Sequence, residues 1–142
     1  SLLLRIVEVS TSSSDRQAKV VASELLHAIC LVMLGNAAKG PARRKGQEHQ
    51  SVHYEKIYRR LFPAILRLAT DMELVTRQLF SVFVKQLIHW FTSNTQKENP
   101  DTMALLDSIL DGLVDAENGS LRYYCDLLEK FVVMAMTVTR SY

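Results

Sequence analysis

Apolar residues recur at three- and four-residue intervals along nearly the whole chain, and no stretch alternates as a half-buried strand would. This pattern predicts an all-α protein of about six helices. We expect the helices over residues 1–9, 15–34, 51–70, 71–92, 100–113 and 120 to near the end. Because the first resembles the tail of a longer helix, we also expect that the chain is part of something longer.

Residues with capping chemistry mark several of these boundaries. The expected N-terminal signals are Ser14 with Gln17, Thr70 with Glu73, and Asn99 with Pro100. The run 10–14 should form a turn, and Gly35 with Asn36 should stop the second helix. Pro63 lies inside the third helix, where it removes a backbone donor and should kink the helix.

Each predicted helix has a face that we expect to be buried. In the second helix the face comprises Ala18, Val21, Ala22, Leu25, Leu26, Ile29, Val32 and Met33. In the third it comprises Tyr54, Ile57, Tyr58, Leu61, Ile65 and Leu68, and in the sixth Leu121, Cys125, Leu128, Val132 and Met136.

The fourth predicted helix is apolar over more than half of its circumference, so we expect it to have neighbours on more than one side. It ends with His89 beside Trp90, a pair that suggests a ligand site, a base-stacking platform or ordinary packing. The two positions point about 100° apart on a helix, which makes a shared ligand difficult. We expect Trp90 to pack in the core and His89 to lie at a solvated edge.

The order of the helices suggests a repeat. Apolar–basic pairs near helix starts, followed by small residues and leucine, are typical of the second helix of a HEAT repeat. The matches are Ala18-Lys19, Leu121-Arg122 and, more loosely, Val75 with Arg77. We therefore predict an α-solenoid of HEAT-like helical hairpins, in which residues 1–142 form a single segment of a larger chain. Its one clear loop, residues 36–50, should be flexible and basic.

The formal charge of +2 is small, but cations gather in and after this loop. The candidate contacts to nucleic acid or another partner are Lys39, Arg43, Arg44, Lys45, Lys56, Arg59 and Arg60. The first four could neutralise several phosphates, with a strong dependence on salt. A solvated insertion without a partner and a nuclear-import signal explain the same composition.

The sequence contains no recognisable catalytic, cofactor or metal site. His27, His49, His53 and His89 lack metal-ligand spacing, and Asp107, Asp111 and Asp115 are expected to form a solvated row. Cys30 and Cys125 should be inert thiols on apolar faces in a reducing compartment. The longest apolar run near a terminus, Phe131–Met136, is too short to span a membrane, so no membrane is expected as a partner.

Several segments together resemble one family of very large kinases. They are SDRQAKV (14–20), ELLH (24–27), FPAILRLA (62–69), VTRQL (75–79), QLIHWFT (86–92), DTMALLDSILDGLVD (101–115) and, more weakly, LRYYC (121–125). The family is that of the DNA-dependent protein kinase catalytic subunits, which are related to the phosphatidylinositol 3-kinases. The resemblance weakens in the loop and beyond Cys125, so it does not support a function for the basic residues.

This resemblance implies a nuclear serine/threonine kinase that joins broken DNA ends by non-homologous end joining with the Ku heterodimer. It implies a HEAT-repeat segment with a mechanical role, whose partners are the rest of the parent chain, Ku and DNA ends. ATP and Mg are implied only for the kinase domain, which does not fall in this chain. Two alternatives are an independent helical-repeat module that binds proteins, and a nucleic-acid binder acting through the basic loop.

Overall fold

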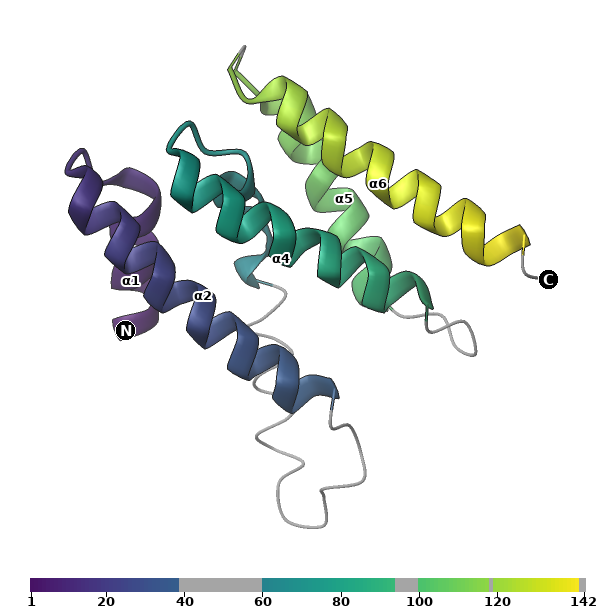
Figure 1. Cartoon of the computed structure of the whole chain (residues 1–142), viewed down its shortest axis with the longest axis horizontal. Helices are drawn as coiled ribbons and strands as arrows, with labels where there is room; N and C mark the ends of the chain where they lie inside the picture. The colour runs from purple at the N-terminus through teal and green to yellow at the C-terminus, as the bar shows by residue number, and fades with distance from the viewer. Residues whose placement is uncertain (39–59, 94–99, 118, 141–142) are drawn as a thin grey trace. The chain divides into compact units, whose positions relative to one another are not determined.

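The structure is a computed structural model that describes residues 1–38, 60–93, 100–117 and 119–140 (Figure 1). The described residues form helices joined by turns, and none of them lies in a strand. The prediction of an all-α protein is therefore confirmed. The chain divides into two compact units, Ser1–Phe62 and Pro63–Tyr142.

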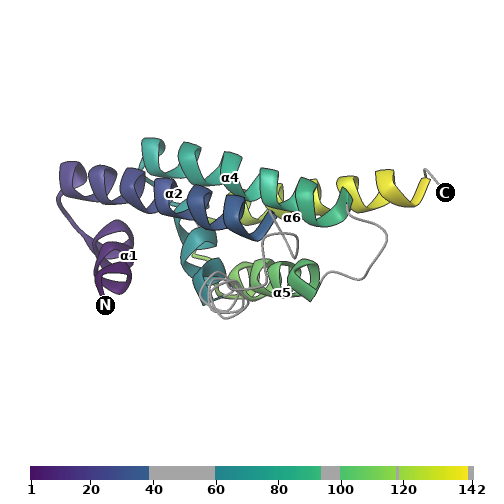
Figure 2. The ribbon, with the colours of Figure 1, turned by 90° about the horizontal axis from the view of Figure 1, so that it is seen from below.

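The first unit contains a hairpin of α1 (Leu2–Ser12) and α2 (Arg16–Ala38), which pack against each other (Figures 1 and 2). Asp15 caps α2, because its Oδ1 atom accepts the N–H of Gln17 at 3.0 Å and its carbonyl oxygen accepts the N–H of Lys19 at 2.9 Å. The prediction that Ser14 is the cap was wrong by one residue. Aspartate and serine cap helices about equally well, so residue type did not separate the two.

Both helices of this hairpin are longer than predicted. The turn expected over residues 10–14 was placed too early, since α1 continues to Ser12. Ser10 Oγ donates to the Ile6 carbonyl at 2.7 Å and Thr11 Oγ1 donates to the Val7 carbonyl at 2.8 Å. These bonds satisfy the hydroxyl groups within the helix, so the serine-rich run does not break it. At the other end, Gly35 and Asn36 do not stop α2, and residues 36–38 of the predicted loop are helical.

Only part of the predicted face of α2 is buried. Leu26 and Met33 are buried as predicted, and Ser23 and Cys30 complete their stripe. Three other residues of that face are exposed, namely Val21, Leu25 and Val32, and three are half-buried, namely Ala18, Ala22 and Ile29. The prediction failed because α2 carries apolar residues around most of its circumference, so periodicity did not specify one face.

The helical segment 60–69 corresponds to the described part of the predicted third helix. Leu61, Ile65 and Leu68 are buried in it as predicted, whereas Tyr54, Ile57 and Tyr58 lie outside the described residues. The segment stays helical through Pro63, whose side chain is exposed.

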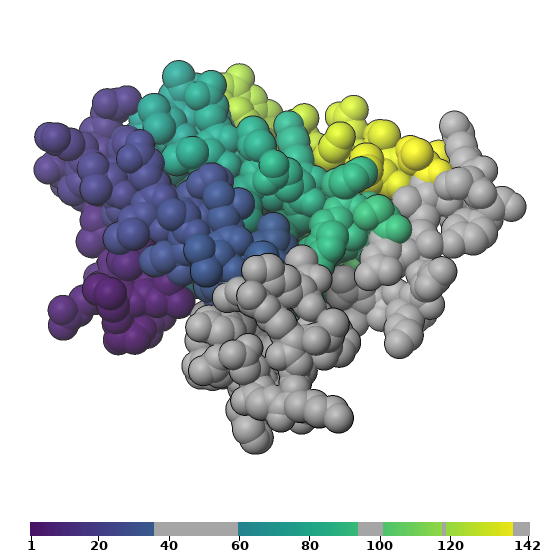
Figure 3. Space-filling view, turned by 60° about the horizontal axis from the view of Figure 1, so that its bottom comes forward, coloured from purple at the N-terminus to yellow at the C-terminus, as the bar shows by residue number. Residues whose placement is uncertain are grey.

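The second unit contains α4 (Leu74–Ser93), α5 (Pro100–Asp115) and α6 (Leu121–Arg140). Helix α6 packs against both α4 and α5, and Figure 3 shows the atoms of α4 and α6 next to each other on one face. Pro100 is the first residue of α5 as predicted, whereas its expected cap, Asn99, lies outside the described residues. Helix α5 ends at Asp115, slightly later than expected.

The start of α4 uses a different cap from the one predicted. Thr70 Oγ1 donates to the Leu66 carbonyl at 2.9 Å, so it belongs to the end of the preceding helix. Glu73 caps α4 instead, since its Oε2 atom accepts the N–H of Thr76 at 2.7 Å. Asp71 Oδ1 in turn accepts the N–H of Glu73 at 2.8 Å. The acidic residues also suit the positive end of the helix dipole.

The predicted face of α6 was wrong. The residues that α6 buries are Tyr124, Leu127 and Phe131. Most of the predicted set is exposed, namely Leu121, Cys125, Val132 and Met136, and Leu128 is half-buried. Two apolar stripes run side by side along this helix, and the one that includes the aromatic residues packs against α4 and α5.

Candidate functional site

The basic residues proposed from sequence fall almost entirely outside the described residues. This holds for Lys39, Arg43, Arg44, Lys45, Lys56 and Arg59. Arg60, the remaining one, is exposed at the start of the helical segment 60–69. A nucleic-acid or partner contact through this set stays a prediction.

The second unit has a cleft of about 410 Å³ where the start of α6 lies beside the first half of α4. Its lining residues are Ala69, Arg77, Gln78, Ser81, Val82, Tyr123 and Asp126. In the sequence, Arg77 and Arg122 stand out only as possible signals of a helical repeat. Nothing in the spacing of two residues on separate helices could have indicated that they meet.

A stack of two guanidinium groups on one aromatic ring forms one side of this cleft. The Arg77 Cζ atom lies 4.4 Å from the centroid of the Tyr123 ring, and the Arg122 Cζ atom lies 4.7 Å from it. Arg122 also donates a hydrogen bond to the Tyr123 hydroxyl. Arg77 is held in place because its Nη1 atom donates to the carbonyl oxygens of Asp71 at 2.8 Å and Met72 at 3.2 Å. Arg77 therefore ties the turn before α4 to the first turn of α6.

An ion pair joins the same two helices. Lys85 Nζ lies 3.0 Å from Asp126 Oδ2, and both side chains are partly exposed. Surface pairs of this kind contribute about 0–1 kcal/mol. The lining combines Arg77 with Asp126 and includes the hydroxyl groups of Ser81 and Tyr123, but no histidine that could activate either of them. The cleft therefore has the chemistry of a helix–helix junction, and it shows no arrangement for nucleophilic catalysis.

The two thiols differ in their surroundings. Cys30 is buried, and burial raises the pKa of its thiol to about 12, so it is an unreactive packing group as predicted. Cys125 is exposed on α6, so the prediction that it packs on an apolar face was wrong within the described residues.

Burial also lowers the pKa of His27 in α2 below its usual value.

The pair at the end of α4 does not form a joint site. His89 is exposed, as predicted. Trp90 is half-buried and packs its ring against that of Phe91, at a centroid distance of 5.1 Å, so the prediction of a fully packed Trp90 is only partly met. The buried residues of α4 are Thr76, Phe80, Phe83, Val84, Leu87, Ile88 and Phe91.

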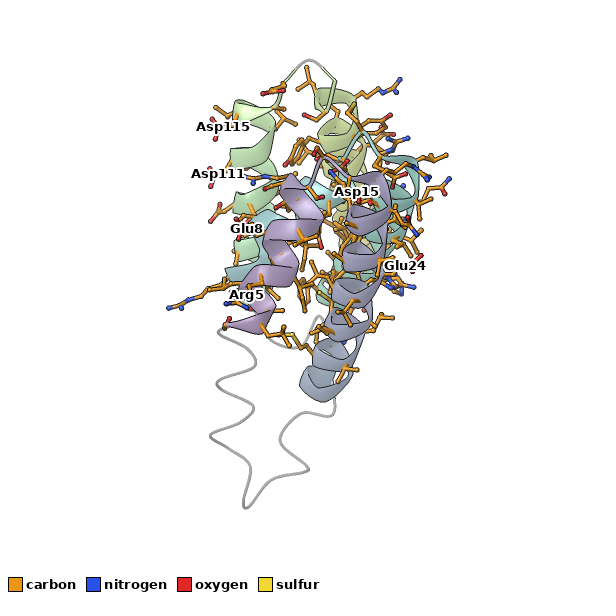
Figure 4. All side chains as sticks on the ribbon, turned by 90° about the vertical axis from the view of Figure 1, so that its left-hand side faces the viewer. Arg5, Glu8, Asp15, Glu24, Asp111 and Asp115 are labelled. Atoms are coloured by element: carbon orange, nitrogen blue, oxygen red, sulfur yellow. The ribbon has the colours of Figure 1, made fainter. Side chains whose placement is uncertain are left out.

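Within the described parts of the chain, no group of three His, Cys, Asp or Glu side chains is arranged to hold a metal ion. Asp107, Asp111 and Asp115 are exposed along α5. Figure 4 shows Asp111 and Asp115 pointing outward from that helix. The figure also shows Arg5 and Glu8 on α1, Asp15 just before α2, and Glu24 on α2.

Among the described helices, α2 over Arg16–Gly35 is long and apolar enough to cross a membrane by length and composition alone. A core helix of a soluble protein passes the same test, so this single helix is weak evidence for a membrane span.

Comparison with known proteins identifies one family. Residues 52–141 match the family model described as "DNA-dependent protein kinase catalytic subunit, CC1/2". The chain is 50% identical over 123 residues to the DNA-dependent protein kinase catalytic subunit of Xenopus laevis, and 49% identical over 123 residues to that of Canis lupus familiaris. It is 42% identical over 121 residues to the protein of that name from Dictyostelium discoideum. These alignments cover 85–87% of this chain but only 3% of each relative, so the chain spans a small part of their length.

Proposed function

Because the chain belongs to the family of DNA-dependent protein kinase catalytic subunits, we propose that it is a non-catalytic helical scaffold segment of such a kinase. In this proposal the parent protein is a serine/threonine kinase that acts in the nucleus, in the repair of double-strand breaks by non-homologous end joining. The catalytic domain, with its ATP and Mg, belongs to another part of the parent chain. Ku and DNA ends are partners of the whole protein.

The proposal is supported by the interactions of the side chains in the second unit, which join one helix to another. The largest buried residues of α4 and α6 pack helix against helix, and the cleft beside these two helices is lined by Arg77 and bordered by an ion pair. These interactions support a role in fixing the spacing between helices, since the described side chains of the cleft serve to join α4 and α6. We propose that the helical hairpins stack as an α-solenoid, since a hairpin with apolar residues on two faces cannot bury both alone.

The proposal can be tested in the full-length kinase that carries this chain. Phe131→Ala removes a buried ring from α6, a change that costs about 3–5 kcal/mol in well-packed cores. Glu129→Gln is the matched control, because Glu129 is exposed on the same helix. The measurements are peptide phosphorylation with and without Ku and DNA, and limited proteolysis to follow local unfolding of the segment.

For a scaffold, Phe131→Ala should loosen the segment and lower DNA-stimulated phosphorylation more than basal phosphorylation, while Glu129→Gln should change neither. Unchanged DNA stimulation in a Phe131→Ala protein whose segment is demonstrably opened would refute a scaffold role. Loss of basal phosphorylation in folded Glu129→Gln protein would point instead to chemistry in this segment.

A further inference from the structure

The cleft beside α4 and α6 has a wall from each of these helices. Residues at helical spacing form the two walls, so each group lies on one side of its helix. They are Arg77, Gln78, Ser81 and Val82 on α4, and Tyr123 and Asp126 on α6. The volume of about 410 Å³ is large enough for a few side chains of a ligand. Val82 is 57% exposed, so the cleft presents an apolar side chain that the described residues leave largely uncovered.

The described residues do not neutralise the arginines at this cleft. Arg77 uses its Nη1 atom for the carbonyl oxygens of Asp71 and Met72, and its Nη2 and Nε atoms make no hydrogen bond to a described residue. Arg122 makes its described contacts with the ring and the hydroxyl group of Tyr123. Within the parts of the chain that the structure describes, neither arginine is paired with a carboxylate.

The carboxylates near the cleft are engaged elsewhere. Asp126 Oδ2 lies 3.0 Å from Lys85 Nζ, which balances its charge. Asp71 and Glu73 accept backbone N–H groups at the start of α4. The first turns of α4 and α6 also meet at this cleft, and the positive ends of the two helix dipoles add to the positive potential. The cleft therefore favours a negatively charged ligand.

We propose that this cleft binds an acidic segment of a partner protein. A glutamate or aspartate carboxylate of that segment accepts hydrogen bonds from the Nη2 and Nε atoms of Arg77, and a neighbouring apolar side chain packs on Val82. Gln78 and Ser81 have no hydrogen-bond partner among the described residues, and they provide donors and acceptors for the peptide groups of the segment. This interaction goes beyond the scaffold role and does not depend on it.

The lining favours a peptide over a nucleic acid. A nucleic acid is held by several cations that follow successive phosphates. The cleft instead combines its arginines with an exposed valine and with Asp126, whose carboxylate repels a doubly charged phosphate more than a singly charged carboxylate. An acidic peptide with apolar residues matches the charge, the exposed valine and the hydrogen-bonding side chains together.

The binding experiment uses a short rhodamine-labelled peptide of glutamate and leucine residues, and fluorescence anisotropy measures its affinity for the full-length kinase that carries this chain. The matched peptide has glutamine in place of glutamate, so it keeps the leucines and loses the charge. We expect the glutamate peptide to bind at least about tenfold more tightly than the glutamine peptide. Because salt screens charges at partly exposed sites, this difference should shrink when NaCl is raised from about 50 to about 500 mM.

Two substitutions of Val82 separate this cleft from other sites on the large protein. Val82→Glu places a carboxylate in the cleft, where it pairs with Arg77 and repels the ligand, so the glutamate peptide should bind at least about tenfold more weakly. Val82→Lys removes the same apolar surface but adds a cation, so the affinity should fall less than about threefold. Val114→Glu is the matched control and should change nothing, because Val114 is 82% exposed on α5 and does not line the cleft.

Equal affinity for the two peptides, or no binding of either, would overturn the proposal. So would equal losses of affinity in the Val82→Glu and Val82→Lys proteins, or a loss in the Val114→Glu protein. Binding of a single-stranded oligonucleotide that Val82→Glu abolishes, without binding of the glutamate peptide, would assign the cleft to nucleic acid instead. None of these results bears on the scaffold role, which Phe131→Ala tests separately.

Discussion

Gly112 in α5 lies directly against the ring of Tyr124 in α6. Replacing Gly112 with alanine should therefore destabilise the second unit. A Cβ atom at position 112 would lie 2.2 Å from Tyr124 Cε1, 2.6 Å from Cζ and 2.8 Å from the hydroxyl oxygen. Side-chain carbons do not approach ring atoms this closely, so the tyrosine or the helix would have to move. Tyr124 is only 8% exposed, which leaves its ring little room.

Two opposing effects determine the magnitude. Alanine is favoured over glycine inside a helix by about 0.8–1.0 kcal/mol. Forcing additional atoms into a packed site costs about 1–3 kcal/mol, and contacts with three ring atoms place this site toward the upper end. The net loss for Gly112→Ala should therefore be about 1–2 kcal/mol, which lowers the Tm by a few degrees in a chain of this size.

The assay is urea and thermal unfolding followed by circular dichroism, with Gly35→Ala as the control. Gly35 is also helical, but a Cβ atom there would meet nothing within 4 Å. Gly35→Ala should therefore raise the free energy of unfolding by about 0.4–1 kcal/mol. Replacing Tyr124 with alanine in the Gly112→Ala background should cancel most of the steric cost, as a double-mutant cycle would reveal. If Gly112→Ala stabilised the chain as much as Gly35→Ala, the close contact between α5 and α6 would be refuted.

Three further predictions concern caps, the face of α6 and pH. Asp15→Ala should cost about 1 kcal/mol in unfolding free energy while Ser14→Ala costs little, and equal effects would contradict the assigned cap. Leu127→Ala should cost about 2–5 kcal/mol and Leu128→Ala clearly less, and the reverse order of urea midpoints would mean that the other stripe is buried. Because burial lowers the pKa of His27 below 6.5, the unfolded chain binds more protons than the folded chain in that range, so stability should fall as pH drops through about 6.5. Thermal unfolding from pH 8 to pH 5 should show this fall, His27→Gln should reduce it, and an identical pH profile for the variant would rule out His27 as its source.

The sequence alone predicted which segments form helices, but it did not predict the residues at which these helices begin and end. Hydrophobic spacing identified every helix that the structure describes, because a period of 3.6 residues persists over long runs. The caps were missed by one residue at Asp15 and by three at Glu73, since serine, threonine and acidic residues are adjacent at both places. The structure adds contacts that the spacing does not specify, such as the bond from the Glu73 N–H to Asp71 Oδ1.

The cleft was beyond sequence analysis for a different reason. The stack of Arg77 and Arg122 on Tyr123 depends on α4 and α6 lying side by side, and on the turn carbonyls that hold Arg77. Helical spacing predicts which residues share a face of one helix, but not which faces of two helices meet. For the basic residues of the loop, composition alone suggested a binding partner. Most of them lie outside the described residues, so their predicted contact stays a prediction.

The error over α6 carries the most physical information. The predicted stripe and the buried stripe are both apolar and adjacent, so a reading of periodicity had no reason to choose the one with Tyr124 over the one with Leu128. An isolated domain would gain from polar residues on the stripe that it leaves uncovered, since exposed apolar rows promote aggregation. Val132 and Met136 are nevertheless 46% and 49% exposed, so the burial of α6 among the described residues follows the stripe with the aromatic residues. Which stripe of α6 is buried therefore depends on the faces that α4 and α5 present to it, and the periodicity of one helix does not contain that information.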